Sequence, residues 1–139
     1  NSMAIPAGRI MLQRIEELLQ QGVSFSIETT LATRSYLQLV KRAQAEGYVV
    51  NILFFWLESP ELAVQRVAQR VSEGGHDIAA DVIRRRYELG LKNFFHLYKD
   101  AVDTWTLVDN ACNPRHVIAT DEDILDVELY KKIETYVND

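Results

Sequence analysis

One apolar run constrains the fold of this chain more than any other feature. The nine residues from Val49 to Leu57 read VVNILFFWL, and all of them except Asn51 are apolar. A strand that faces water on one side alternates apolar and polar residues, whereas a strand covered on both faces is apolar almost throughout. Such strands belong to parallel sheets, so the run predicts a buried strand of a parallel sheet.

Helix and strand patterns alternate on both sides of this run. Apolar residues at helical spacing predict helices over 9–21 and about 31–46, each followed by a glycine that can end it. Between them Val23, Phe25 and Ile27 alternate with polar residues, which predicts a strand over Val23–Thr29. We also expect helices over about 60–73, 77–102 and 123–136, and short strands over 104–108 and within 114–120. This order implies right-handed crossovers in a single α/β domain, residues 1–139, with a parallel sheet and helices on both faces.

Capping residues and apolar faces refine three of these helices. Ser59-Pro60-Glu61 is a strong helix start, with a capping hydroxyl, a proline in the first turn and an early acid. Thr30 and Asp77 can cap the helices that follow them. In the last helix we expect an inward face formed by Ile124, Leu125, Leu129 and Ile133.

Arginines gather between Arg66 and Tyr87, although the chain as a whole has a net charge of −5. Two basic clusters flank a Gly-Gly-His-Asp break at 74–77. Guanidinium groups grip phosphate oxygens through paired hydrogen bonds, so this stretch can close over an anion. The alternative is two surface helices with solvated arginines. Arg85 falls on an expected apolar face with Ile78, Val82 and Leu89, where an arginine usually needs a partner.

Polar residues follow each predicted parallel strand. They are Glu28-Thr29-Thr30, Glu58-Ser59 and Asp109-Asn110. Ligands of open α/β sheets bind beyond the carboxyl ends of the strands, so we expect these residues to meet at one edge beside the arginine-rich stretch.

Composition excludes several classes of protein. The acidic net charge argues against broad nucleic-acid binding. The chain has a single cysteine, no signal peptide and no apolar run of about 20 residues, which favours a cytoplasmic protein without a membrane span. No Cys or His residues stand at ligand spacing, so we expect no metal site made by the chain alone.

Six short stretches, taken in order, resemble the zeta-toxin-like family of P-loop kinases. They are Ser26–Ala32, Leu53–Leu57, Arg66–Val71, Gly74–Asp77, Ile83–Tyr87 and Leu107–Asn110. The resemblance covers about residues 8–118. It implies a three-layer P-loop fold, binding of ATP or GTP with Mg²⁺, and transfer of the γ-phosphoryl group to a hydroxyl of a small substrate such as a UDP-sugar. For toxin members it also implies an antitoxin protein as partner.

The chain departs from the family in one respect, because it contains no Gly-x-x-x-x-Gly-Lys-[Ser/Thr] phosphate loop. Either it is the C-terminal part of a longer kinase, truncated on the N-terminal side, or it is a natural remnant that has lost catalysis. We expect no measurable kinase turnover from these 139 residues alone, since that loop cradles the phosphates and holds Mg²⁺. The competing function is a non-catalytic domain that binds an acidic ligand or a protein partner. An open sheet edge also predicts self-association.

The resemblance assigns phosphate-binding roles within an arginine-rich lid at about 66–86. Arg70 and Arg85 are the expected contacts of the γ-phosphate, and Arg84 is the alternative to Arg85 and a nucleotide contact. Arg66 and Arg86 are expected to be solvated or salt-bridged.

The strand-end residues have expected roles and simpler alternatives. Glu28 can orient a Mg²⁺-bound water or a substrate hydroxyl, or it can pair with an arginine or cap a helix. Thr29 and Thr30 are expected substrate contacts, although an N-cap also explains Thr30. Asp109 and Asn110 border the nucleotide base or form an ordinary turn.

Overall fold

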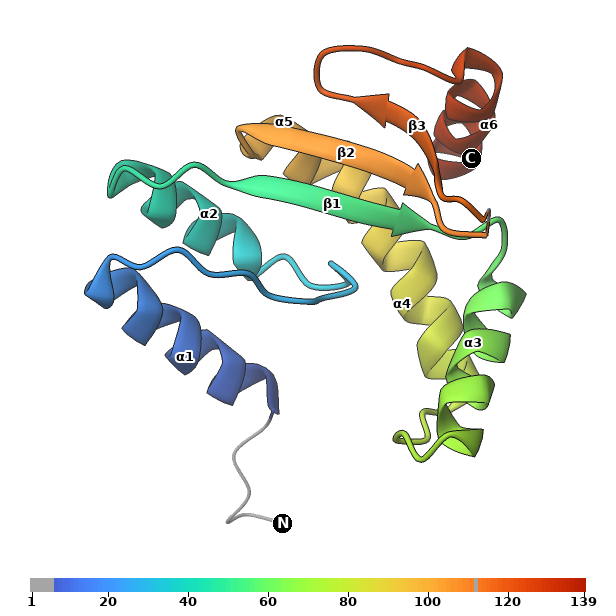
Figure 1. Cartoon of the computed structure of the whole chain (residues 1–139), viewed down its shortest axis with the longest axis horizontal. Coiled ribbons are helices and arrows are strands. Elements are labelled where there is room, and N and C mark those ends of the chain that lie inside the picture. The colour runs from blue at the N-terminus through green and yellow to red at the C-terminus, as the bar shows by residue number, and fades with distance from the viewer. Residues whose placement is uncertain (1–6, 112) are drawn as a thin grey trace.

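The computed structural model describes residues 7–111 and 113–139, and within them the chain forms a mixed α/β fold around a three-stranded sheet (Figure 1). The elements in chain order are α1 (Ala7–Gln21), α2 (Tyr36–Ala45), β1 (Asn51–Trp56), α3 (Pro60–Ser72), α4 (Ala80–Asn93), the π-helix η1 (Phe94–Tyr98), α5 (Lys99–Ala101), β2 (Thr104–Asp109), β3 (His116–Thr120) and α6 (Val127–Asn138). None of the described helices is long and apolar enough to span a bilayer.

The sheet has the order β1-β2-β3 and is parallel only in part. The central apolar run forms β1, which pairs in parallel with β2 from Asn51 opposite Thr104 to Trp56 opposite Asp109. The predicted parallel pairing of these two strands is therefore confirmed. β3 runs antiparallel to β2, because it follows after a short loop that reverses the chain, whereas a parallel strand needs a long crossover.

The predicted strand over Val23–Thr29 is wrong. Its residues belong to no strand and pair with none of the described strands. Phe25 instead packs against α1 and α2 with its ring edge-on to Tyr48, at 6.1 Å between centroids. The Tyr48 hydroxyl donates to the Val23 carbonyl at 3.0 Å. Alternating apolar residues are compatible with any extended segment, and only a neighbouring strand makes such a segment part of a sheet.

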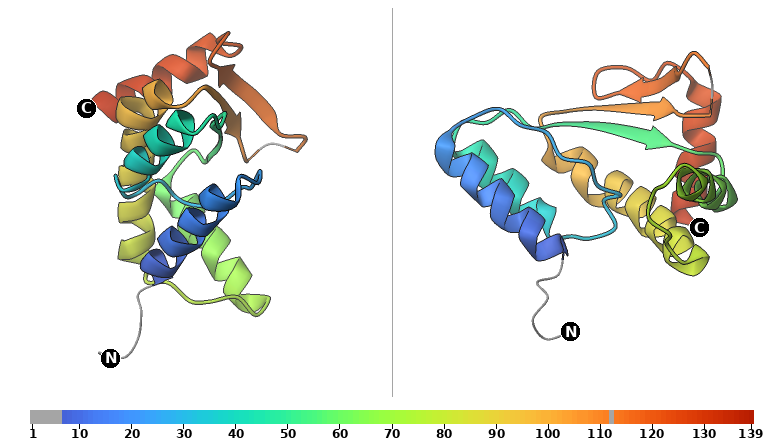
Figure 2. Two further views of the ribbon diagram at one scale, coloured as in Figure 1. Left: turned by 90° about the vertical axis from the view of Figure 1, so that its left-hand side faces the viewer. Right: turned by 60° about the horizontal axis from the view of Figure 1, so that its bottom comes forward.

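Helices α2, α4, η1 and α6 pack on one face of the sheet, which corrects the expected three-layer arrangement (Figure 2). Phe94 of η1 lies in this core without exposed surface, stacked on Phe54 at 4.7 Å and edge-on to Trp105 at 5.6 Å. On the opposite face Leu53 and Phe55 of β1 remain 55% and 42% exposed. The apolar sequence of β1 indicates two faces that can be covered, and the described helices cover one of them.

One predicted helix cap is confirmed and two are wrong. The Ser59 hydroxyl accepts from the Leu62 amide at 3.3 Å at the start of α3, as Ser59-Pro60-Glu61 predicts. Thr30 caps no helix, because the chain turns at Leu31, which has a φ of 59°, and α2 begins only at Tyr36. Asp77 is also not a cap, since α4 begins after Ala79 without a side-chain cap.

Two predicted apolar faces are only partly confirmed, since Ile133 is buried and Leu129 packs against the core as predicted, but other members are exposed. In α4 the buried residues are Ile83, Gly90 and Leu91, while Leu89 and Arg85 are exposed, so Arg85 needs no buried partner. In α6 the buried residues are Tyr130, Ile133 and Val137. Ile124 and Leu125 precede α6 and are exposed, because Asp126 caps the helix by accepting from the Leu129 amide at 3.1 Å.

Candidate functional site

The carboxyl ends of β1 and β2 lie side by side and form a polar edge. Trp56 pairs with Asp109, and the Asn110 amide donates to the Trp56 carbonyl at 2.8 Å. The two segments expected at this edge, Glu58-Ser59 and Asp109-Asn110, therefore meet there. One Asp109 carboxylate oxygen accepts from the Ala111 amide at 3.0 Å, which is the ordinary turn that the sequence allowed.

A helical hairpin projects from this edge (Figure 1). It consists of α3, the turn at 73–79 and α4, and we refer to it as the α3–α4 hairpin. Gly74 has a φ of 98°, and the Gly75 amide donates to the Arg70 carbonyl at 2.7 Å. A Cβ at Gly75 would lie 2.9 Å from that same oxygen, so this turn requires glycine.

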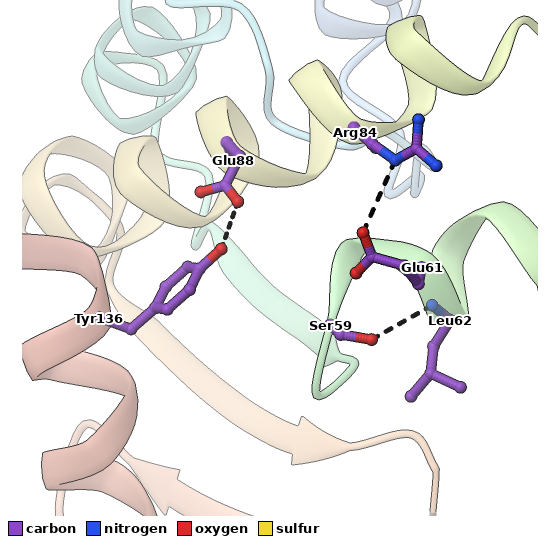
Figure 3. A network of polar contacts seen from close by, with 6 residues as sticks. All are labelled: Ser59, Glu61, Leu62, Arg84, Glu88 and Tyr136. Carbon is purple, nitrogen blue, oxygen red and sulfur yellow. Dashed lines mark hydrogen bonds and ion pairs between the residues drawn. The ribbon is translucent and has the colours of Figure 1, made fainter.

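The arginines of the hairpin divide into bonded and unbonded groups. Arg66 is exposed, as expected of a solvated side chain, and also donates to the Asn110 carbonyl at 2.9 Å. Arg84 forms an ion pair with Glu61 of α3 at 3.7 Å, with both side chains at least half exposed (Figure 3). Arg70, Arg85 and Arg86 are exposed and make no hydrogen bond or ion pair with any other described residue. Arg70 and Arg85 are thus available to an external anion, whereas Arg84 must first leave Glu61.

Two tyrosines that the sequence analysis missed hold α4 in place. The Tyr87 hydroxyl donates to the Leu57 carbonyl at 2.6 Å, directly after β1, and burial raises the pKa of Tyr87. The Tyr136 hydroxyl of α6 donates to Glu88 (Figure 3). Burial, as the larger cause, and this hydrogen bond, as the smaller one, raise the pKa of Tyr136 to about 12. The position of Tyr87 directly after the arginine triplet was the available sequence signal.

The loop that contains Glu28, Thr29 and Thr30 contacts α4 and η1. The Thr30 carbonyl lies so close to Gly90 that a Cβ there would be 2.0 Å from its oxygen. Asn93 donates to the Leu31 carbonyl at 2.7 Å, and the Tyr98 hydroxyl donates to the Thr33 carbonyl at 2.7 Å. The loop is therefore fastened to the helix that carries Arg84–Arg86.

The side chains of this loop differ in what they do. The Thr29 hydroxyl accepts from the Leu31 amide at 3.1 Å, which stabilises the left-handed turn at Leu31. Glu28 and Thr30 are exposed, and their side chains make no hydrogen bond or ion pair with other described residues. The simpler alternatives, an arginine partner or a helix cap, are thus not seen in the described part of the chain.

The described residues contain no group of three or more His, Cys, Asp or Glu side chains placed to hold a metal ion. The site is instead rich in cationic groups. Exposed arginines on a hairpin beside the carboxyl ends of parallel strands are typical of proteins that bind phosphate-bearing ligands.

The comparisons with known proteins agree with this class. The Zeta toxin family matches residues 3–132, so the chain belongs to the zeta toxin family. An uncharacterized protein of Haemophilus influenzae is 32% identical over 83 residues, which make up 60% of this chain and 59% of the relative. The chain therefore spans less than two thirds of that relative. No solved structure matches this chain.

Proposed function

We propose that this chain supplies the lid and the acceptor-binding side of a kinase that uses ATP or GTP. Such an enzyme transfers the γ-phosphoryl group to a hydroxyl of a small substrate, with a UDP-sugar as the candidate. The carrying observation is that Arg70 and Arg85 are exposed and unbonded among the described residues, on a hairpin that begins at the carboxyl end of β1. We also propose that the protein acts in the cytoplasm, where ATP and GTP would be available to it.

The chemistry of phosphoryl transfer explains why these arginines matter. Negative charge spreads over the oxygens of the phosphoryl group as it leaves, and guanidinium groups aimed there stabilise the transition state. Arg85 suits this role better than Arg84, because Arg84 is paired with Glu61. We assign Arg84, Asp109 and Asn110 to the nucleotide.

The acceptor side of the proposed site is the loop fastened to α4. Glu28 is an exposed carboxylate that can orient a substrate hydroxyl or take its proton. Thr29 and Thr30 stand beside it and are our candidates for contacts to the substrate. The contact of Thr30 with Gly90 holds this loop relative to the arginines of α4.

The residues present fit the nucleotide better than they fit a metal ion. The arginines complement a triphosphate, but no described carboxylate cluster can hold Mg²⁺ without it. Bound with the nucleotide, Mg²⁺ supplies charge neutralisation at the phosphates. Glu28 is the carboxylate we propose for orienting a Mg²⁺-bound water.

A titration of ATP into the isotopically labelled chain, followed by amide NMR signals, tests this function. We expect weak binding that shifts signals of the α3–α4 hairpin and of residues 109–111. The double variant Arg70→Ala/Arg85→Ala should weaken it, whereas Arg9→Ala/Lys131→Ala, which removes the same charge elsewhere, should not. Equal effects of the two double variants, or shifts spread over the whole surface, would contradict the proposal and favour a non-catalytic domain.

We propose two protein partners beside the nucleotide and the substrate. An antitoxin protein is one, because the chain belongs to the zeta toxin family. A second copy of the chain is the other. Leu53 and Phe55 of β1 are 55% and 42% exposed, and Val49 just before the strand is 77% exposed. An open apolar strand at a sheet edge pairs readily with another chain.

A further inference from the structure

The corner between β3 and α6, residues 120–128, exposes three large apolar side chains. Ile124, Leu125 and Val127 are 41%, 58% and 51% exposed. Two of them lie on the face that the sequence predicts to be buried, and the late start of α6 leaves them outside the helix. Contiguous exposed apolar residues on a soluble domain mark sites of interaction.

Hydrogen bonds hold this corner in a defined shape. The Thr120 amide donates to the Asp123 carbonyl at 2.7 Å, and the Leu125 and Asp126 amides both donate to the Ile118 carbonyl at 2.9 Å. Asp126 also contacts His116 at 3.0 Å, and this contact lowers the pKa of Asp126. The apolar side chains therefore project from a frame that is already ordered, which reduces the entropy lost on binding.

The charge around the corner has one sign. Between Val117 and Tyr130 the chain has no Lys or Arg and five acidic residues, namely Asp121, Glu122, Asp123, Asp126 and Glu128. Asp121 and Asp126 have structural partners, the Trp105 amide at 3.0 Å and His116. Glu122, Asp123 and Glu128 are exposed. A hollow of about 430 Å³ is lined by residues 120–124 with Trp105 and Tyr130, so that Ile124 borders it.

Cations stand next to this corner but outside it. Lys131 and Lys132 follow it in α6, and Lys99 is held by aromatic side chains. Lys99 donates to the Tyr130 hydroxyl at 2.6 Å and lies about 5 Å from the ring centroids of Phe95, Trp105 and Tyr130. An anionic ligand or an anionic lipid surface would thus meet repulsion from the exposed carboxylates at this corner.

We propose that the 120–128 corner binds a segment of a partner protein that presents apolar side chains beside lysine or arginine. The apolar groups of the partner cover Ile124, Leu125 and Val127, and its cations meet Glu122, Asp123 and Glu128. The residues of this surface differ from those of the proposed phosphate site, which takes ligands of the opposite charge.

A defined peptide tests the proposal on the whole chain. The probe is a synthetic helical peptide with leucine on one face and lysine on the other, and its counterpart carries glutamate in place of lysine. We expect the lysine peptide to shift amide NMR signals of residues 120–128, and the glutamate peptide to leave them unchanged. Leu125→Ser/Val127→Ser should weaken binding about tenfold or more, as expected for loss of two buried aliphatic contacts. Both substitutions are at exposed positions, and circular dichroism confirms that the variant is folded.

Matched charge variants separate local recognition from general attraction to an acidic protein. Glu122→Gln/Glu128→Gln should weaken binding severalfold, whereas Glu46→Gln/Glu73→Gln, at the ends of α2 and α3, should not. Equal losses from the two pairs would overturn the proposal, and so would shifts centred on another surface. Self-association through this corner in the absence of peptide, seen by sedimentation, would also overturn it by making a second copy the occupant.

Discussion

Similar apolar sequence patterns form different structures in the N-terminal and C-terminal halves of the molecule. In the C-terminal half, residues 51–139, the three strands and η1 enclose residues without exposed surface, including Phe94, Tyr98, Leu107 and Ile118. In the N-terminal half, residues 7–50, Ile15, Leu19 and Ala43 form a small buried cluster beside an extended segment that joins no strand, while the buried Leu31 belongs to the larger core. Alternating apolar residues thus became a strand only where a neighbour supplied hydrogen bonds. We expect the N-terminal half to open locally at lower free energy than the C-terminal half.

The largest expected effect sharpens this comparison directly. Phe94→Ala removes a ring from the C-terminal core and should lower the free energy of unfolding by about 3–5 kcal/mol. Leu19→Ala, in the smaller cluster, should have a weaker effect, near the lower end of the roughly 2–5 kcal/mol range for leucine truncation. Urea unfolding of both variants measures the difference. A larger loss from Leu19→Ala would reverse our ranking of the two halves.

The next effect concerns the chemistry proposed for the hairpin of the C-terminal half. In a version of the protein that carries a Gly-x-x-x-x-Gly-Lys-[Ser/Thr] loop, Arg70→Ala and Arg85→Ala should each lower steady-state ATP or GTP turnover by about a hundredfold. Their effect on nucleotide binding should be smaller, because the charge they meet grows in the transition state.

Two further variants control this prediction. Lysine at position 70 or 85 should not restore full turnover, since a point charge lacks the paired geometry of guanidinium. Arg66→Ala should change turnover little, because Arg66 is exposed and is not among the groups proposed to contact the γ-phosphate. The opposite result is that Arg66→Ala abolishes turnover while Arg70→Ala and Arg85→Ala stay within about twofold of the parent. The phosphate-binding arginines would then have to be Arg66 and either Arg84 or Arg86.

Gly90 tests the contact that joins the two halves. A Cβ at this position would lie 2.0 Å from the Thr30 carbonyl oxygen, so Gly90→Ala must displace the 28–33 loop from α4. Overpacking of this kind costs about 1–3 kcal/mol. Hydrogen exchange should show faster opening of residues 28–35 with little change in β2. Gly47→Ala is the control that meets no neighbouring atom, although its positive φ adds a local strain. Unchanged exchange at 28–35 would show that the loop does not depend on this contact.

Self-association should respond to the exposed face of β1. Leu53→Thr/Phe55→Thr introduces β-branched residues, which favour strands, while reducing the apolar surface of β1, so the dissociation constant of any dimer should rise about tenfold. Sedimentation equilibrium measures this change. Ile10→Thr, an exposed position on α1, should leave the constant unaltered. A parent chain that stays monomeric at high concentration would rule out the self-association.

The smallest effect is a dependence on pH at Asp103, which also links the halves. Its carboxylate accepts from the Val50 amide at 2.7 Å and from Gln44 at 3.2 Å, and the bond from Val50 is the main cause that lowers the pKa of Asp103. Because the pKa of Asp103 is lower in the folded state, its contribution to the free energy of unfolding is complete above the ordinary pKa of 3.8. This contribution is lost as the pH falls below that value. Asp103→Asn should therefore flatten the loss of stability between about pH 4 and pH 2 in thermal unfolding. An unchanged pH profile in the variant would assign that loss to other carboxylates.

Several features of the protein followed from the sequence alone. The apolar run at 49–57 predicted β1, and the order of elements predicted its parallel partner at 104–108. Ser59-Pro60-Glu61 predicted the start of α3, and Gly74-Gly75 predicted its end. Short motifs also indicated the family, which the match over residues 3–132 confirms. These features depend on residues close together in the chain, because burial pattern, backbone dihedral preference and capping are local properties.

The tertiary structure decided the rest. It left Val23–Thr29 unpaired, exposed Ile124 and Leu125, and bonded Arg66 to Asn110. It also revealed Tyr87 and Tyr136 as the groups that hold α4 at the strand ends. In each case the outcome depends on a partner that is distant in the sequence, and a local pattern carries no information about which distant group completes a hydrogen bond or covers an apolar face.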